Sequence, residues 1–212
     1  EPPPVMEARR WIAGVSFPAD RPLINVSQAA PVDSPPLGLR QALAEATEDT
    51  VYLVIRSGFD AVCMHRIEGS FPIRTLVLEV GSRRPLGVGA GGLAILAAIG
   101  QQEQEDVIER VAPQLGAFGH LTAESASEAC AAARARGAAV IEGTINLGVV
   151  AVGHSFRDAM GQAVGALSVA ALSQRMTNPR IQTIAQQLRE ACGEVERCLR
   201  SQRRLGWAAG RI

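Results

Sequence analysis

The chain has 212 residues, of which 47% are hydrophobic and 20% charged, which is enough apolar material for one domain with a packed core. Its 21 basic and 21 acidic residues balance to a formal net charge of zero, so the chain as a whole lacks the basic character of a nucleic-acid-binding domain. Every basic residue is arginine, which excludes mechanisms that need a Schiff-base lysine or a phosphate-loop lysine.

The first 36 residues are rich in proline, and we interpret them as a linker rather than as part of a core. A helix is expected from Leu37, because Leu39, Leu43 and Ala46 fall on one helical face.

A series of antiparallel hairpins is predicted next. Residues 50–55 and 61–66 are rich in β-branched and apolar side chains, and a turn over 57–60 separates them. After a second turn over 68–70, residues 74–80 are predicted to form a third extended segment.

The second half of the chain alternates between helical and strand patterns. Helices are predicted over 93–99, around Val107 to Leu115, and over 124–136, where Gly137 provides a stop signal. Two further strands are predicted over about 149–156 and 163–172.

A final helix is predicted to follow these strands, with Asn178 as its cap and Pro179 at its first position. Strands followed by helices, and then again strands followed by a helix, predict an α+β domain.

A glycine-rich loop opens the helix predicted at residue 93. Gly87, Gly89 and Gly92 match the spacing of a dinucleotide-binding loop, but no strand-helix-strand unit surrounds them, so nucleotide binding is disfavoured. Free backbone N–H groups at a helix start are suited to binding a carboxylate or phosphate. Close packing of the helix on a sheet is the alternative reason for the glycines.

Three segments together resemble the effector-binding domain of IclR-type bacterial transcription factors. Their order and spacing agree with the family pattern from residue 37 to about 205. The matching residues are Pro85, Leu86, Ala90, Gly92, Ala94, Leu96 and Ala97 in the glycine loop, Gly137, Glu142 and Gly148 before a strand, and Gly161, Ala166, Leu167, Ser168 and Val169 in the last strand.

The resemblance implies a GAF- or profilin-like curved antiparallel sheet of about six strands flanked by helices. Residues 37–205 would form the effector-binding domain and residues 206–212 a C-terminal tail. Residues 11–15 resemble the end of a winged helix-turn-helix, so residues 1–36 would be a linker with a remnant of the wing. DNA would then be bound only through a winged domain that this chain lacks.

The family comparison also implies partners and a location. We expect a homodimer or homotetramer that binds a small-molecule effector in the cytoplasm, with no cofactor, no metal and no membrane association. No apolar run is long enough to span a membrane, and no secretory signal begins the chain.

The effector-binding residues implied by the resemblance are Gly89, Ala90, Gly91, Gly92, Glu142, Ala151, Ser168 and Ala170. Where this chain departs from the family pattern, small or apolar residues replace polar ones, as Gly91, Leu93 and Ala170 do. Because a buried unpaired charge is costly, we expect a fairly apolar aliphatic or aromatic acid as effector, or loss of the ancestral ligand.

No catalytic set assembles, since His65, His120 and His154 are scattered over different predicted elements. A small hydrolase using Cys63 or Ser168 as nucleophile is the enzyme alternative, and a ligand-free dimerisation module is the structural one.

Several other residues near the first hairpin have two readings. Cys63 and His65 alternate in a predicted strand, which would place them on one face as half of a metal site, although a buried thiol is favoured. Met64 and Phe71 could line an effector site, but ordinary core or surface roles are favoured. Residues 83–84, two arginines, are interpreted as a solvated turn rather than a phosphate clamp.

Overall fold

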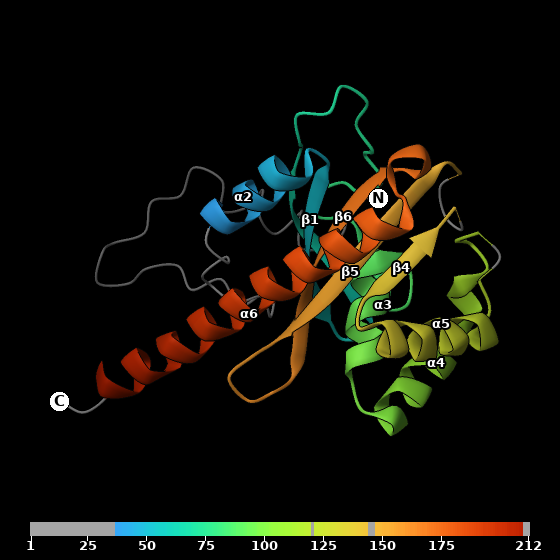
Figure 1. The fold of residues 1–212 in the computed structure, drawn as a ribbon. Helices are drawn as coiled ribbons and strands as arrows, with labels where there is room; N and C mark the ends of the chain where they lie inside the picture. Colours follow the sequence, from blue (N-terminus) through green and yellow to red (C-terminus); the bar gives the residue numbers. More distant parts are fainter. Residues whose placement is uncertain (1–36, 120, 144–146, 210–212) are drawn as a thin grey trace, which may run out of the picture. The chain divides into compact units, whose positions relative to one another are not determined.

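The computed structural model of the chain describes residues 37–119, 121–143 and 147–209 (Figure 1). The predicted linker and wing remnant, residues 1–36, lie outside the described residues, as does His120. Helix α6 continues to Ala209, past the predicted domain boundary at residue 205.

A curled sheet of six strands, all paired antiparallel, forms the centre of the domain, as predicted. Its order is β3-β2-β1-β6-β5-β4, so the two central strands come from opposite ends of the domain sequence. The strands are β1 (Thr50–Ser57), β2 (Asp60–Ile67), β3 (Arg83–Pro85), β4 (Ala139–Glu142), β5 (Val149–Arg157) and β6 (Ala163–Leu172).

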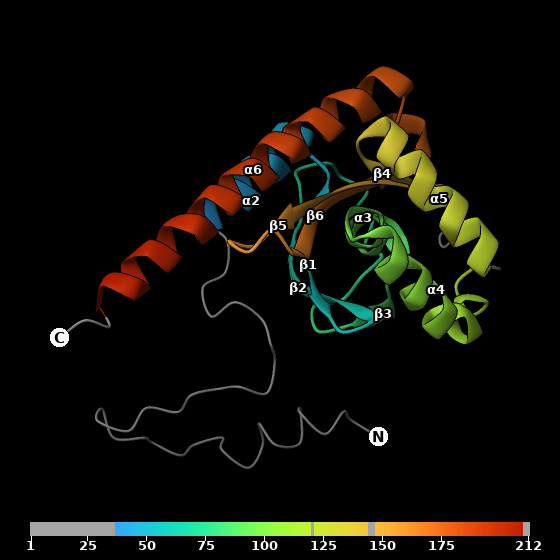
Figure 2. The same ribbon diagram turned by 90° about the horizontal axis from the view of Figure 1, so that it is seen from below.

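Helices cover both faces of the sheet, which explains why β1 and β6 are apolar along almost their whole length (Figure 2). The short helix α2 (Leu37–Thr47) and the long helix α6 (Asn178–Ala209) lie on one face. Helices α3 (Gly89–Ala98), α4 (Gln101–Leu115) and α5 (Ala123–Arg136) lie on the other.

Each face of the sheet has its own apolar core. Leu53 and Leu167 belong to the core under α2 and α6, which includes Leu188. Val54 and Ala166 belong to the core under α3, α4 and α5. Within the described residues, no helix is both long enough and apolar enough to cross a membrane.

Local sequence signals account for both ends of α5. A capping box joins Thr122 and Ser125 at the start of α5, and Gly137 ends that helix in the left-handed conformation at φ 75°. Asn178 is the first residue of α6 rather than its cap, because the N–H of Ile181 donates to the carbonyl of Thr177.

The predicted strand over residues 74–80 is wrong. The chain between β2 and β3 forms no strand, and we call residues 71–82 the strap. Buried side chains hold it: the Tyr52 hydroxyl donates to the carbonyl of Thr75 at 2.6 Å and accepts from the N–H of Val77 at 3.0 Å. The Thr75 hydroxyl in turn donates to the carbonyl of Ala170 at 2.8 Å. Side-chain hydrogen bonds therefore replace the pairing of a strand.

A β-bulge in β2 separates two residues that were expected to share a face. Leu53 pairs with His65 but Val54 pairs with Cys63, so Met64 is an extra residue in the ladder. Cys63 consequently lies with Val54 in the core under α3, and His65 lies on the face of Leu53. The prediction that Cys63 and His65 point to one face is wrong.

A buried ion cluster joins the start of β1 to the start of α6. Asp49 is 4% exposed, and its carboxylate forms two ion pairs. Arg180 Nη2 lies 2.8 Å from one carboxylate oxygen, and Arg175 Nε lies 3.2 Å from the other. The Arg175 guanidinium also lies over the ring of Phe71, 3.7 Å from its centroid, and so connects the strap to this cluster.

Candidate functional site

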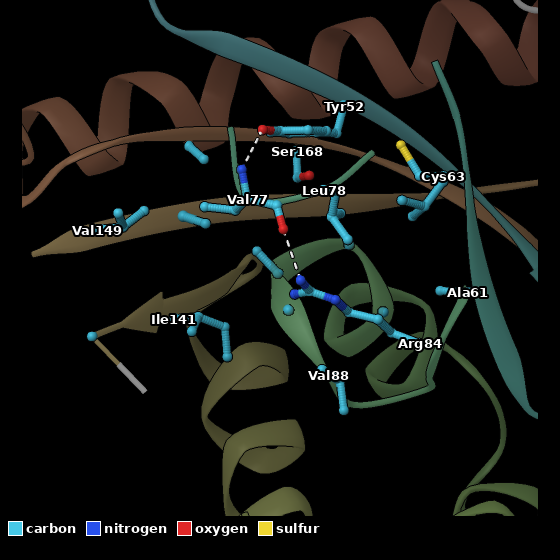
Figure 3. Close-up of a pocket in the computed structure, with 18 residues that line it drawn as sticks. Tyr52, Ala61, Cys63, Val77, Leu78, Arg84, Val88, Ile141, Val149 and Ser168 are labelled. Atoms are coloured by element: carbon cyan, nitrogen blue, oxygen red, sulfur yellow. Dashed lines mark hydrogen bonds between the residues drawn. The ribbon is translucent and has the colours of Figure 1, made fainter. Parts of the chain in front are cut away.

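A cavity of about 50 Å³ lies between the sheet and the start of α3 (Figure 3). The sheet, the glycine loop, β3 and the strap all contribute walls. Its lining residues are Tyr52, Val54, Ala61, Cys63, Val77, Leu78, Arg84, Val88, Gly89, Ala90, Gly91, Gly92, Ile141, Gly143, Val149, Ala151, Ser168 and Ala170.

Small side chains on adjacent strands create the space. Ala151 of β5 pairs directly with Ala170 of β6, and Ser168 pairs with Tyr52 of β1. Residues that face each other across a ladder share one face of the sheet, so these side chains form a continuous floor. Ala151, Ser168 and Ala170 are three of the residues predicted for an effector site.

The glycines of the loop differ in what surrounds them. A Cβ on Gly91 would lie 2.6 Å from Cγ2 of Val54, so this glycine permits close packing of α3 on β1. A Cβ on Gly153 would lie even closer to the carbonyl of Ala90, so the sheet also needs a glycine at this contact. Gly89, by contrast, has φ 76° and no atom within 4 Å of the place its Cβ would take, where the loop faces open space.

The start of α3 presents uncapped backbone groups to this cavity. Its cap residue Val88 provides no side-chain hydrogen bond, and the N–H groups of Gly89, Ala90 and Gly91 precede the first acceptor that the helix can offer. With the positive end of the helix dipole, these groups are suited to binding an anion.

Ser168 adds a buried hydroxyl that lacks a partner. The residue is 5% exposed, and its hydroxyl makes no hydrogen bond to any residue that the structure describes. Figure 3 shows the side chain directed into the cavity, and a Cβ on Gly91 would lie 3.6 Å from its Oγ. Because the side chain borders the cavity, its hydroxyl can donate to or accept from a polar atom of a ligand placed there.

Arg84 is the site residue that sequence reasoning missed. It lies on β3 with its guanidinium in the cavity wall, where Nη2 donates to the carbonyl of Val77 at 2.7 Å. Its neighbour Arg83 points outward and pairs with Asp60 at 3.0 Å. The interpretation of both arginines as a solvated turn is wrong, because both lie in β3, although Arg83 is exposed to solvent as expected and Arg84 is half-buried. Alternation along β3 separates them, but a strand of three residues is too short to recognise in sequence.

The remaining candidates lie elsewhere. Glu142 is exposed on β4 and does not line the cavity, although its neighbours Ile141 and Gly143 do. Met64 packs against the core under α6, and Phe71 stacks on Arg175 outside the cavity.

Nucleophilic chemistry finds little support at this site. Burial raises the pKa of Cys63 to about 11, so the residue remains a thiol at neutral pH. Its Sγ contacts the carbonyl of His65, whereas the carbonyl of His154 is contacted by Cys192. Among the described residues, no group of three or more histidine, cysteine, aspartate or glutamate side chains is placed to hold a metal ion.

A curled six-stranded antiparallel sheet with helices on both faces is also the fold of solved IclR-type C-terminal domains. The chain belongs to the IclR family: residues 35–209 match the family model described as bacterial transcriptional regulator IclR C-terminal. This is a family of transcriptional regulators and not of enzymes, and the family predicted from the sequence is confirmed.

Individual relatives agree with this assignment. The HTH-type transcriptional regulator KipR of Bacillus subtilis is 24% identical over 158 residues, which are 74% of this chain and 63% of KipR. The crystal structure of the Thermotoga maritima IclR protein superposes with a TM-score of 0.71 at 24% identity, covering 77% of this chain and 66% of that one. The C-terminal domain of the E. coli regulator KdgR gives a TM-score of 0.66 at 20% identity, covering 76% and 94%. The chain therefore spans less than two thirds of KipR and of the Thermotoga protein.

Proposed function

We propose that residues 37–205 form an effector-sensing domain that binds a small, fairly apolar organic acid in the cavity at the start of α3. The observation that carries this proposal is that the Ser168 hydroxyl and the uncapped start of α3, at Gly89 and Ala90, line the same cavity. Donors from two elements then converge on one small space, while Val54, Ala151 and Ala170 supply apolar walls. A carboxylate with an apolar body matches both features.

Effector binding would act by shifting the population between quaternary arrangements. We propose that the chain forms a homodimer or homotetramer, and that the effector binds one arrangement more tightly than another. DNA would be contacted in the cytoplasm by a helix-turn-helix domain N-terminal to this region, as the name of KipR suggests for that relative. The distance between two such domains would then follow the arrangement of the sensing domains.

A thermal-shift screen of small aliphatic and aromatic carboxylic acids tests the proposal. A ligand present at a hundredfold excess over its Kd adds about 2.7 kcal/mol to the free energy of unfolding, which is a shift of several degrees. We expect Ser168→Ala to weaken that shift and Ala90→Leu to abolish it by filling the cavity, whereas Ser201→Ala on the exposed side of α6 leaves it unchanged.

Sedimentation of the same samples tests the regulatory step. A ligand that changes the distribution between dimer and tetramer supports the sensor. If no acid stabilises the protein, a ligand-free dimerisation module becomes the better description. If an acid binds without any dependence on Ala90 or Ser168, the site lies elsewhere.

A further inference from the structure

Arg84 is the one charged side chain among the described residues that line the cavity. Other arginines nearby have acidic partners: Arg56 pairs with Glu103 at 2.7 Å and Arg66 with Glu68 at 3.2 Å. No described carboxylate lies within ion-pairing distance of Arg84. Among the described residues, the charge of this cation is therefore not balanced by an acidic side chain.

The guanidinium is fixed in place but has donors to spare. Nη2 donates to the carbonyl of Val77 in the strap (Figure 3). The ring of Phe118 lies 5.8 Å from the central carbon of the group. A guanidinium carries five N–H donors in a planar fork, so one hydrogen bond leaves most of them available. A carboxylate can accept two of the remaining donors side by side.

Burial makes this arrangement expensive without a ligand. Desolvation lowers the pKa of Arg84, which means that the surroundings disfavour the charged form, although a guanidinium stays protonated at neutral pH. An anion in the cavity would remove that penalty. A second anionic group on the same ligand would remain unpaired against the apolar walls. A ligand with an amine would be repelled by the guanidinium.

We infer that Arg84 selects the charge of the ligand: it binds one carboxylate, and the ligand is a monocarboxylic acid whose remaining body is apolar. The inference rests on the proposed effector site, and it assigns the recognition of charge to β3. The donors at the start of α3 and the Ser168 hydroxyl carry only partial charges, so they favour an acid over its amide weakly. Arg84 carries a full charge, and most of the preference for an acid is therefore assigned to it.

Calorimetric titration with matched probes tests this assignment. Benzoate and benzamide have nearly the same size and differ in charge, as do hexanoate and hexanamide, and adipate adds a second carboxylate to the aliphatic chain. In the wild-type protein we expect each acid to bind on the order of tenfold or more tightly than its amide, as a charge-assisted hydrogen bond predicts, and adipate to bind more weakly than hexanoate.

Three variants test which residue causes the preference for acids over amides. Arg84→Met should remove most of the preference for acids and bring the acid-to-amide ratio toward one. Arg84→Gln, which retains a donor for the Val77 carbonyl, should do the same if the methionine variant folds poorly. Arg83→Met is the matched control, because Arg83 is adjacent in sequence but points away from the cavity toward Asp60, and it should keep the wild-type ratio.

The outcomes separate this inference from the proposed function. Equal binding of acids and amides by the wild type, or a preference for acids that survives in Arg84→Met, overturns the role of Arg84 while the effector site stands. Failure of every probe to bind the wild type overturns both. A ligand-free measurement adds a second test: a lowered Tm of unliganded Arg84→Met together with an unchanged acid-to-amide ratio marks Arg84 as structural only.

Discussion

Gly91 and Val54 meet where α3 lies on β1, and a Cβ atom on Gly91 would stand 2.6 Å from Cγ2 of Val54. Val54 is 3% exposed and β-branched, so its side chain has little freedom to move aside. We expect Gly91→Ala to lower the free energy of unfolding by about 1–3 kcal/mol, the usual cost of overpacking a core. Urea denaturation of the variant measures the change.

The next residue is a matched control. A Cβ on Gly92 would have its nearest neighbours at 3.6 Å, an ordinary contact, in the same helix. Because alanine is the better helix former by about 1 kcal/mol, Gly92→Ala should be neutral or slightly stabilising. If both variants behave alike, the close approach of Gly91 to Val54 does not limit packing here.

Asp49 should be the most sensitive polar residue of the fold. Asp49→Asn removes the negative charge that Arg175 and Arg180 share, and it leaves two partly buried cations without an acid between them. Breaking a buried ion pair in this way costs about 3 kcal/mol or more. Thermal or urea unfolding checks the value.

Glu48→Gln tests whether burial of the carboxylate is the reason for the large loss of stability expected in Asp49→Asn. Glu48 also pairs with Arg175, at 3.3 Å, but its side chain is 57% exposed. Exposed pairs contribute at most about 1 kcal/mol, so this variant should be close to wild type. A loss as large as that of Asp49→Asn would contradict the special role of the buried carboxylate.

Thiol labelling should distinguish one cysteine from the other three. Burial raises the pKa of Cys63 and of Cys130 to about 11 and that of Cys192 to about 12, and all three side chains are buried. Cys198 is partly exposed on α6. At pH 8 a thiol-specific reagent should therefore modify Cys198 alone in the folded protein.

The variant Cys198→Ser should then be inert until it is unfolded, when the three remaining thiols react. Mass spectrometry after short exposure identifies the site. Rapid native labelling of Cys63 would reopen a nucleophilic role for it.

Acid should weaken the fold through His154. Burial lowers the pKa of His154 below its ordinary value of 6.5, assisted by Arg189 and opposed by Glu196 and by the carbonyl of Ser155. Above about pH 6.5 the ring is neutral in both states, and as the pH falls below that value the unfolded chain takes up the proton first. Stability is therefore present above the unfolded pKa and is lost below it.

We expect the free energy of unfolding of the wild type to fall between pH 7 and pH 5 by no more than about 1.4 kcal/mol per pH unit for this group. His154→Gln should show a shallower slope in urea titrations across that interval. His65, whose pKa burial also lowers, remains as a smaller contribution in the variant. An unchanged slope would show that His154 is not the group responsible.

The regular elements of the fold were predictable from sequence because each is long enough to show its pattern. The runs at β1, β5 and β6 are apolar and β-branched, and the capping signals at Thr122 and Gly137 mark the ends of α5. Short features escaped prediction. Strand β3 has three residues and β4 has four, too few to show alternation, and the bulge at Met64 leaves no mark in composition.

The strap shows why β-type composition alone misleads. Residues 74–80 are rich in apolar and β-branched side chains, but the partner for their backbone is the Tyr52 hydroxyl, distant in sequence. Tertiary contacts, rather than composition, therefore determine that residues 74–80 do not form a strand.

The small residues of the sheet and the glycine loop that line the candidate site were predictable from sequence, but its charged residue was not. Family resemblance indicated Ala90, Ser168 and Ala170, which the structure places around one cavity; their role in binding an effector stays a prediction. Arg84 could not be assigned, because two adjacent arginines before a proline look like a solvated turn unless the direction of each side chain is known.

The position of β1 beside β6 also governs how the domain can be made. Thr50 pairs with Ala170, so the central ladder joins residues 120 positions apart, and β1 has no second neighbour until that pairing forms. During synthesis the sheet can be closed only after β6 has left the ribosome, when most of the domain is already translated. Until then one side of β1, apolar along its length, presents unpaired backbone groups to other chains. Refolding must close the same long loop, so folding should be slow compared with domains of local topology.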